Sequence, residues 1–565
     1  MGLVPSVVSY GYKPAGQVSA VTSVVGVVNY SLDSGDRLSS IVSPAGTFSY
    51  SYNVYNGLLS GMICTSGVSA TYTYDVLDRP TGLEWRNISN AVVRSFSYGY
   101  NAAGLATNMT RENGESAAFS YYDLDRLTSE QWYNTTGGVV HSASYQYDLV
   151  GNRTQAVING QSINYTLSAN RLTSWGTNGS QQFDAAGNVT NLQDDSGRQL
   201  SVTWDSRYSL TAVYTNGTLA ESYGYDALGR RISISDGSAA TYLIYDGSHV
   251  IAETASDGSL TRSYVYSPAV DDILAMKVYG VTTQTYYYVK DRVGTVNALV
   301  DESGVTKESY RYDAWGNVLG VYDSTGGVMQ TSAVGNRYLW QGREYSFKTK
   351  LNYFRARYYD SETGRWLSND PIGIAGGLDQ YVFCSDNPVM FRDPYGLVKW
   401  KQAARATLGI IGNSAGIAVG IGVGLLPEPT MITKVAGVAI MLKSGYGYGA
   451  NIRNLSDAIL DRNSSSRGSL ATDVAELTSP GNQQAQRLAN IVDLTTDLLT
   501  GIQARNAAIN SLGQLDRFGL ERVYVTDPTD LGRAVESLQA ADVGWTIWEA
   551  GEDVLGNLHD NDTCK

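Results

Sequence analysis

Cysteine and histidine are scarce in this sequence of 565 residues, with three of each. Cys64, Cys384 and Cys564 lie far apart, so neither a disulfide framework nor a CxxC metal site is expected, and each is predicted to be a free or buried thiol. Basic residues are also few, because 41 Lys and Arg stand against 54 Asp and Glu, and the formal net charge is −13. A protein that binds a phosphate backbone needs clustered positive charge, so nucleic acid is not an expected partner of residues 1–397.

A secretory signal is also missing from the start of the chain. Residues 1–16, MGLVPSVVSYGYKPAG, contain no basic segment followed by an apolar core and a cleavage site. Repeat-like sequence begins at Tyr10 with no capping segment ahead of it, although repeat arrays normally need caps. We therefore expect either export by another route or a chain that is a fragment of a longer open reading frame.

Tyrosine and glycine are abundant instead. The chain holds 41 Tyr and 60 Gly but only 9 Phe and 17% charged residues, a composition that favours strands joined by tight turns. The pattern aromatic-x-aromatic-Asp-x-x-Gly-Asn/Arg-hydrophobic recurs over the first 320 residues, with a period of about 18–26 residues. The clearest copies are YTYDVLDRPTGL from Tyr72, YQYDLVGNRTQAV from Tyr145, YGYDALGRRISI from Tyr223 and YRYDAWGNVLGV from Tyr310.

Each copy predicts roughly one β-hairpin. Two aromatics at i and i+2 share one face of a strand, the Asp carboxylate caps the turn, the Gly takes a positive φ, and the Asn or Arg begins the return strand. One hairpin cannot bury its aromatic face alone, but neighbouring hairpins pair laterally and stack Tyr on Tyr, at about 0.2–1 kcal/mol per pair. The prediction is a long, coiling antiparallel sheet, although the period alone leaves open a plain solenoid or propeller with no interior.

Residues 310–397 contain a second set of motifs, in a fixed order. They are QGREYS from Gln341, YFRARYYDSETGRWLSNDPIG from Tyr353, a DNP turn at Asp386, and DPYGL from Asp393 to Leu397. With the repeats upstream, this segment closely resembles the Rhs repeat-associated core domain of Rhs/YD-repeat proteins. Related shells occur in Tc-toxin C proteins, in polymorphic Rhs toxins and in the extracellular teneurins.

The resemblance implies a mainly β fold and a carrier function. YD repeats at 1–309 would spiral into a hollow antiparallel shell, incomplete at its N-terminal end, and the core domain at 310–397 would cap it. In this family the variable polypeptide after the DPxGL motif is often a toxin held inside the shell, and several members cut the chain just after that motif. The equivalent scissile bond here is Leu397–Val398. The N-terminal half of the shell or a B-type subunit would then be a partner.

The resemblance also implies catalytic residues, because the cutting is attributed to aspartates. They map onto Asp370 of SNDPIG and Asp393 of RDPYGL, with Arg365 of GRWLS as a neighbouring cation. Two carboxylates brought close cannot both ionise, so one keeps a proton as an acid while the other activates water as a base. Asp360 is a third candidate, ranked lower because it lies in the turn-like DSETG.

These residues also have a purely structural interpretation. Asp370 and Asp393 each precede a proline, which favours extended backbone, and Asp is a common turn residue. Arg365 would serve equally well in an ion pair inside the core domain. The DPYGL motif would then be a chain-exit turn in which Gly396 supplies φ freedom.

Beyond Leu397 the composition changes, because Tyr becomes rare and Ala, Leu, Ile and Asp dominate. This predicts a domain boundary followed by a Gly-rich hydrophobic segment, 398–450. Within it, residues 406–427 carry no charge and have a glycine at every fourth position from Gly412 to Gly424. Their length and small-xxx-small spacing fit a membrane helix. The glycine content and Asn413 argue instead for packing inside the shell or for a linker.

Residues 451–565 predict a helical variable domain. The stretch 479–501 has Ser479 as N-cap, Pro480 at the first helical position and Gly501 as a stop, with apolar residues recurring at three and four. His559 is the single histidine of the tail, and no Cys/His pair, HExxH or P-loop pattern occurs there. We therefore expect no recognisable catalytic motif and no cofactor in the tail, and at most aspartic-type autoproteolysis in the core domain.

Three functions fit these observations. The first is a secreted or cell-surface carrier that encapsulates its own C-terminal passenger, a polymorphic toxin matched by an immunity protein, and releases it by self-cleavage. The second is an adhesion module that binds cell-surface glycans through its Tyr-rich exterior and has no enzymatic activity. The third makes the tail an active enzyme, which a basic or His-containing constellation would favour. The core-domain motifs favour the carrier.

Overall fold

The computed structural model describes residues 7–14, 16–122, 124–373 and 377–397, which belong to one compact unit of the chain. The Gly-rich segment predicted at 398–450 and the helical domain predicted at 451–565 lie outside the described residues, and so does the apolar run 406–427. Across the described ranges, no helix is long and apolar enough to cross a membrane.

Strands β1–β31 form one antiparallel sheet in which each strand pairs with its neighbours in the sequence. The first half consists of β1 (Ser9–Tyr12), β2 (Val18–Ser23), β3 (Gly26–Leu32), β4 (Leu38–Ser43), β5 (Gly46–Tyr52), β6 (Leu59–Cys64), β7 (Ser69–Tyr74), β8 (Pro80–Arg86), β9 (Val92–Tyr100), β10 (Ala106–Arg111), β11 (Ser116–Tyr121), β12 (Leu127–Tyr133), β13 (Val139–Tyr147), β14 (Arg153–Ile158) and β15 (Gln161–Ser168). The second half consists of β16 (Arg171–Trp175), β17 (Gly179–Phe183), β18 (Val189–Gln193), β19 (Gln199–Trp204), β20 (Leu210–Thr215), β21 (Thr218–Tyr225), β22 (Arg231–Ser235), β23 (Ala240–Asp246), β24 (His249–Thr254), β25 (Leu260–Tyr266), β26 (Ile273–Val278), β27 (Gln284–Lys290), β28 (Val296–Val300), β29 (Thr306–Tyr312), β30 (Val318–Asp323) and β31 (Val328–Met329). The predicted antiparallel β architecture is confirmed.

The turn chemistry of the repeat is confirmed as well. In the repeat at Asp75, Oδ1 accepts the backbone N–H groups of Leu77 and Arg79 at 2.9 and 3.0 Å, and Oδ2 accepts Nε of Arg79 at 2.6 Å. Asp78, three positions after Asp75, has a φ of 60°. Gly229, three positions after Asp226, has a φ of 75°. In these repeats one aspartate thus closes the turn, and Asp75 also fixes Arg79, the residue just before the return strand β8.

A second interaction ties each hairpin to the one before it. The hydroxyl of Tyr147, the second aromatic of its repeat, donates to the carbonyl of Leu127, the first residue of the preceding return strand, at 2.7 Å. The same bond joins Tyr52 to Leu38, Tyr74 to Leu59, Tyr100 to Pro80, Tyr121 to Ala106, Tyr225 to Leu210, Tyr245 to Arg231 and Tyr312 to Val296. Successive hairpins are therefore linked by side chains as well as by the sheet ladder.

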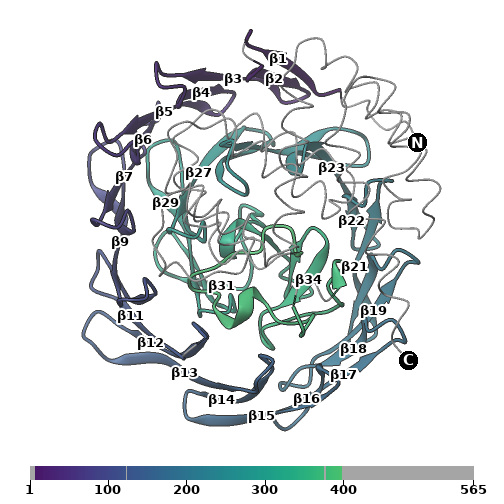
Figure 1. Cartoon of the computed structure of the whole chain (residues 1–565). Coiled ribbons are helices and arrows are strands. Elements are labelled where there is room, and N and C mark those ends of the chain that lie inside the picture. The colour runs from purple at the N-terminus through teal and green to yellow at the C-terminus, as the bar shows by residue number, and fades with distance from the viewer. Residues whose placement is uncertain (1–6, 15, 123, 374–376, 398–565) are drawn as a thin grey trace, which may run out of the picture. The chain divides into compact units, whose positions relative to one another are not determined.

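The sheet coils, so that its later strands lie inside its earlier ones (Figure 1). We call residues 38–158 (β4–β14) the outer arc and residues 273–323 (β26–β30) the inner arc. The indole of Trp85 in the outer arc donates to the carbonyl of Lys290 in the inner arc at 2.8 Å. Tyr287 likewise donates to the carbonyl of Ala45 at 2.9 Å. These contacts join residues more than 200 positions apart.

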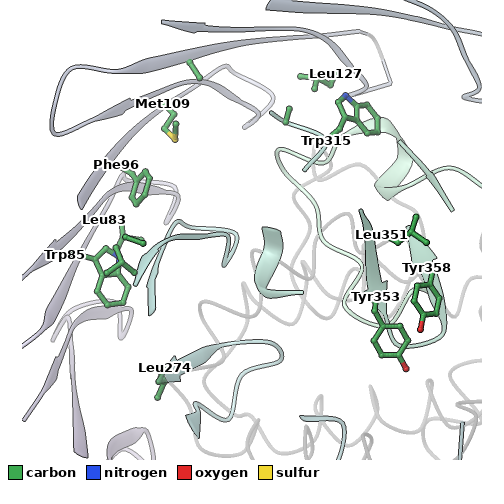
Figure 2. Close-up of a cluster of buried hydrophobic side chains, with 14 of the residues drawn as sticks. Leu83, Trp85, Phe96, Met109, Leu127, Leu274, Trp315, Leu351, Tyr353 and Tyr358 are labelled. Atoms are coloured by element: carbon green, nitrogen blue, oxygen red, sulfur yellow. The ribbon is translucent and has the colours of Figure 1, made fainter. Parts of the chain in front are cut away.

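Burial follows from the coil. Strand β3 alternates between half-buried and exposed residues, whereas all five residues of β28 are buried, because the inner arc is covered on both faces. The core between the arcs is apolar, and Figure 2 shows the side chains of Leu83, Trp85, Phe96 and Met109 directed inward from the outer strands.

Residues 338–397 form short elements inside the coil (Figure 1). These are η1 (Trp340–Gly342), β32 (Glu344–Tyr345), β33 (Leu351–Phe354), β34 (Arg357–Asp360), β35 (Arg365–Trp366) and η3 (Cys384–Asp386). Strands β32–β35 make a separate four-stranded sheet. Polar contacts fasten this segment to the coil: the Tyr359 hydroxyl donates to the Trp315 carbonyl at 2.9 Å, and Arg231 pairs with Glu344 at 2.5 Å.

Candidate functional site

Two aspartates predicted from the sequence come together at the end of the described chain. Asp370 lies in the loop after β35, and Asp393 lies in the last loop, after η3. Both are buried, with 7% and 2% of their surface exposed. Strand β34 carries Arg357, which forms an ion pair with each of the two aspartates.

Arg357 binds both carboxylates through one nitrogen. Its Nη2 lies 2.9 Å from Oδ2 of Asp370 and 3.4 Å from Oδ2 of Asp393. Two further contacts fix the guanidinium in place. Its carbon lies 4.2 Å from the centre of the Trp366 ring, and Nη1 donates to the carbonyl of Gln380 at 2.9 Å. One buried cation therefore contacts an oxygen of each of two buried carboxylates.

Arg357 and Asp393 also bind the segment that leads to the predicted scissile bond. Nε of Arg357 donates to the carbonyl of Gly396, and Oδ1 of Asp393 accepts the backbone N–H of Leu397 at 3.0 Å. Gly396 has a φ of 68°, and a Cβ at this position would lie 2.7 Å from the carbonyl oxygen of Phe354. Leu397 is thus fixed beside the aspartates, while Val398 lies outside the described residues.

Burial controls the electrostatics around these groups. It lowers the pKa of Arg357 below the usual value, and the charges of Asp370 and Asp393 only partly oppose this. The nearby thiol of Cys384 has a pKa raised well above its usual value, first by burial and then by the charge of Asp393. Cys384 and Cys64 are both buried free thiols, as predicted.

Arg365 and Asp360 lie in other contacts. Nη2 of Arg365 pairs with Asp379 at 3.2 Å, and Nη1 donates to Asn152 of the coil at 3.1 Å. Asp360 accepts the Thr363 hydroxyl at 2.6 Å, and burial raises its pKa. Neither residue has a hydrogen bond or ion pair to the aspartate pair among the described contacts, and the cation beside the pair is Arg357.

The family of the chain is decided by a match to a family model. The model described as Teneurin YD-shell matches residues 15–375, which is well over half of the sequence. The chain belongs to this YD-shell family. The resemblance read from the repeats and from the core-domain motifs is therefore confirmed.

Curated relatives of this YD-shell protein include a bacterial nuclease and a bacterial toxin protein. The chain is 35% identical over 226 residues to the tRNA3(Ser)-specific nuclease WapA of Bacillus spizizenii, a match that covers 39% of this chain and 9% of the relative. It is 27% identical over 270 residues to the toxin protein Tse5 of Pseudomonas aeruginosa, covering 40% of this chain and 20% of the relative. The chain thus spans only a small part of the length of either relative.

Solved structures support the same fold. The TcdB2-TccC3 crystal structure covers 69% of this YD-shell chain with a TM-score of 0.57 at 19% identity, and the match spans 22% of that chain. A Tc holotoxin pore structure from Photorhabdus luminescens gives a TM-score of 0.55, with 69% of this chain and 21% of that chain covered at 19% identity. At such identities the likeness concerns the fold.

Arg357 is the site residue of this YD shell that the sequence did not reveal. The stretch YFRARYYD offers Arg355 and Arg357 two positions apart, and Arg365 follows in GRWLS. Arg355 lies in the turn between β33 and β34 with a φ of 60°, whereas Arg357 is the first residue of β34. The alternation of side chains along a strand therefore does not relate the two positions. Arg355 pairs with Asp271 of the coil, and Arg357 faces the aspartates.

Proposed function

We propose that this chain is the shell of a secreted polymorphic toxin, in which residues 1–397 enclose and present a C-terminal passenger formed by residues 398–565. The Gly-rich segment 398–450 would join the core domain at 310–397 to the passenger domain at 451–565. A toxin protein and a nuclease among the relatives support a carrier function, and an immunity protein would be directed against the passenger.

We further propose that the core domain cuts the Leu397–Val398 bond. The supporting observation is that Asp370 and Asp393 share Arg357, while Arg357 and Asp393 also bind the backbone of Gly396 and Leu397. In the proposed mechanism the guanidinium balances one of the two negative charges, and one of the two carboxyls keeps a proton. This is the protonation state that acid–base hydrolysis by two carboxylates requires.

In the proposed reaction one ionised carboxylate takes a proton from water, and the oxygen of that water attacks the carbonyl carbon of Leu397. The protonated carboxyl of the pair donates its proton to the nitrogen of Val398 as the carbon–nitrogen bond breaks. The products are a shell that ends in the Leu397 carboxylate and a passenger that begins at Val398. Arg357 is a positioning residue in this scheme, because it fixes both carboxylates and the chain that approaches them.

Intact-mass spectrometry of purified protein tests this proposal. Wild type is expected to give two fragments separated between Leu397 and Val398, whereas Asp370→Asn and Asp393→Asn are expected to remain one chain of 61.0 kDa. Asp379→Asn is the matched control, since Asp379 is a buried core aspartate that pairs with Arg365 and not with Arg357. This control should still cleave.

Two outcomes would overturn the cleavage proposal. If wild type and all three variants stay whole, the shell keeps its tail and the surface-adhesion function becomes the better account. If Asp379→Asn blocks cleavage as strongly as Asp393→Asn, the effect of the aspartates is on folding. Circular dichroism of each variant separates folding from chemistry.

A further inference from the structure

A second cluster of ionisable side chains lies between the outer and inner arcs, away from Asp370 and Asp393. Glu130 belongs to β12, His141 to β13, and Asp313 follows β29. One ligand atom of each residue lies within 4.8 Å of the others. All three side chains are buried, with 0%, 7% and 7% of their surface exposed.

His141 provides the observation that points to a ligand. Its Nε2 is buried and has no hydrogen-bond partner among the described residues. A buried polar atom without a partner costs about 1–3 kcal/mol, so native proteins rarely leave one without a function. His141 lies opposite Trp132 in the β12–β13 pair, on the inward face that also carries Ala143 and Tyr145.

The two carboxylates add negative charge that no neighbouring cation neutralises by pairing. Among the described ion pairs none involves Glu130 or Asp313, and the Arg153 guanidinium instead stacks 4.2 Å from the Trp315 ring centre. Both carboxylates are buried, so a bound cation would offset the negative charge that they place together.

Each carboxylate is oriented by a neighbour and keeps room for a metal. Oε2 of Glu130 accepts the Trp132 indole at 2.7 Å and the Ala314 N–H at 2.8 Å, and Oδ1 of Asp313 accepts the backbone N–H groups of Trp315 and Asn317, both at 2.9 Å. The other oxygen of each carboxylate accepts one hydrogen bond: the Tyr145 hydroxyl donates to Oε1 of Glu130 at 2.7 Å, and Nδ2 of Asn317 donates to Oδ2 of Asp313 at 2.7 Å. A carboxylate oxygen that accepts one hydrogen bond retains a second lone pair. Hydrogen bonds of this kind are what hold metal ligands in position in metalloproteins.

The spacing fits a small divalent ion. Three atoms no more than 4.8 Å apart share a point no more than about 2.8 Å from each, so an inward movement of well under 1 Å reaches the zinc bond lengths of about 2.0–2.2 Å. A cavity of about 70 Å³ lies beside Asp313, which lines it together with Trp132 and Ala314 among others. A cavity of this size admits water, which would complete the coordination.

We propose that Glu130, His141 and Asp313 form a binding site for a divalent transition metal, with zinc as the preferred ion, and that the metal links the outer arc to the inner arc. Imidazole with two carboxylates is a donor set that suits zinc, whereas calcium and magnesium prefer oxygen ligands alone. The site joins two strands of the outer arc to a turn of the inner arc more than 170 residues later.

Metal binding by the full 565-residue chain tests the proposal. Protein stripped with a chelator is equilibrated with ZnCl₂ or CaCl₂, desalted and analysed for metal by mass spectrometry, and its unfolding temperature is measured with and without each metal. One zinc and no calcium per chain are expected, with a higher unfolding temperature in zinc. His141→Gln is expected to weaken zinc binding at least tenfold and to abolish the shift.

His249→Gln is the matched control. His249 is half-buried, and it stacks on Tyr266 with ring centres 4.4 Å apart while its Nε2 accepts the N–H of Asp271 at 3.3 Å. This variant should bind zinc as wild type does. Equal zinc binding by wild type and His141→Gln, or no retained zinc in wild type, would overturn the proposal.

A measurement on wild type alone covers the case in which His141→Gln does not fold. Protein loaded with Co²⁺ is examined by X-ray absorption at the cobalt edge. One imidazole nitrogen with oxygen ligands is the expected first shell. A spectrum of oxygen ligands only, or one with sulfur, would place the metal elsewhere and refute the site.

Discussion

At the scale of single residues, Asp386 in the DNP turn gives a pH-dependent stability. Burial raises its pKa to about 7, although the charge of Arg126 opposes the rise. The folded protein therefore holds a proton that the unfolded chain has released, and the free energy of unfolding falls as pH rises from about 4 to about 7. In Asp386→Asn this loss disappears, so the variant should gain about 2 kcal/mol relative to wild type between pH 5.5 and pH 8, measured by urea unfolding.

Asp33→Asn provides the comparison for that experiment. Burial tends to raise the pKa of Asp33, but hydrogen bonds from Arg37 and Gly35 outweigh it and lower the pKa below the usual value. The stability that Asp33 contributes is present above its unfolded pKa and is lost only at lower pH. The difference between Asp33→Asn and wild type should therefore be constant from pH 5.5 to pH 8, and a matching slope in both variants would contradict the assignment to Asp386.

Replacement of Gly396 distinguishes the energetic cost of backbone strain from the cost of a steric clash. Gly396→Ala places a Cβ 2.7 Å from the Phe354 carbonyl at a φ of 68°, whereas Gly326→Ala, at a φ of 86°, meets open space. Both variants carry the strain of a positive φ, at about 1 kcal/mol. Gly396→Ala should lose a further 1–2 kcal/mol or so and cleave more slowly after Leu397, as followed by gel electrophoresis over time. Equal effects of the two substitutions would mean that the exit segment is not tightly held.

At the scale of elements, we expect each tyrosine hydrogen bond between hairpins to make a similar, moderate contribution to the free energy of unfolding. Tyr147→Phe removes the hydroxyl that donates to the Leu127 carbonyl and should lower the free energy of unfolding by about 1 kcal/mol. Tyr133→Phe is the control, because its hydroxyl bonds to Gln131 on the exposed face and its loss should cost little. Chemical unfolding of both variants measures the difference, and a smaller loss for Tyr147→Phe than for Tyr133→Phe would contradict the role of these bonds.

The hairpins could be predicted from the sequence because their determinants are local. Asp75, Arg79 and the positive-φ residue between them stand within five positions and identify the turn by chemistry alone. The bond from Tyr147 to Leu127 escaped prediction, since alternation assigns a face to a tyrosine but not a partner. The coiling antiparallel sheet was predicted from the repeats, whereas the hollow shell was predicted from the family resemblance.

The sites were harder to predict because coiling creates them. Asp370 and Asp393 were found through motifs, but the choice of Arg357 over Arg365 depends on how β34 is oriented inside the coil. His141 carried no signal at all, because its neighbour Asp313 is 172 positions away and serves in its own repeat as a turn aspartate.

At the scale of the whole coil, the inner arc should be locally more stable than strand β3, which precedes the outer arc. Strand β28 is buried on both faces, whereas β3 alternates between half-buried and exposed residues. Amides in β28 should therefore exchange with solvent at least tenfold more slowly than those in β3, as measured by hydrogen exchange and mass spectrometry. Strand β4 of the outer arc serves as an internal reference, and similar rates in all three strands would show that the arcs open together.

The contacts between the arcs also restrict how the chain can vary. Tyr287 meets Ala45, Lys290 meets Trp85 and Ala314 meets Glu130, at sequence separations of 242, 205 and 184 residues. The separation shrinks along the chain, as expected when a coil tightens inward. A substitution within one hairpin changes only its own neighbours, but an inserted or deleted hairpin between residues 130 and 287 would shift every later strand against the outer arc by one repeat. The number of hairpins per turn is thus constrained far more strongly than the sequence of any one of them.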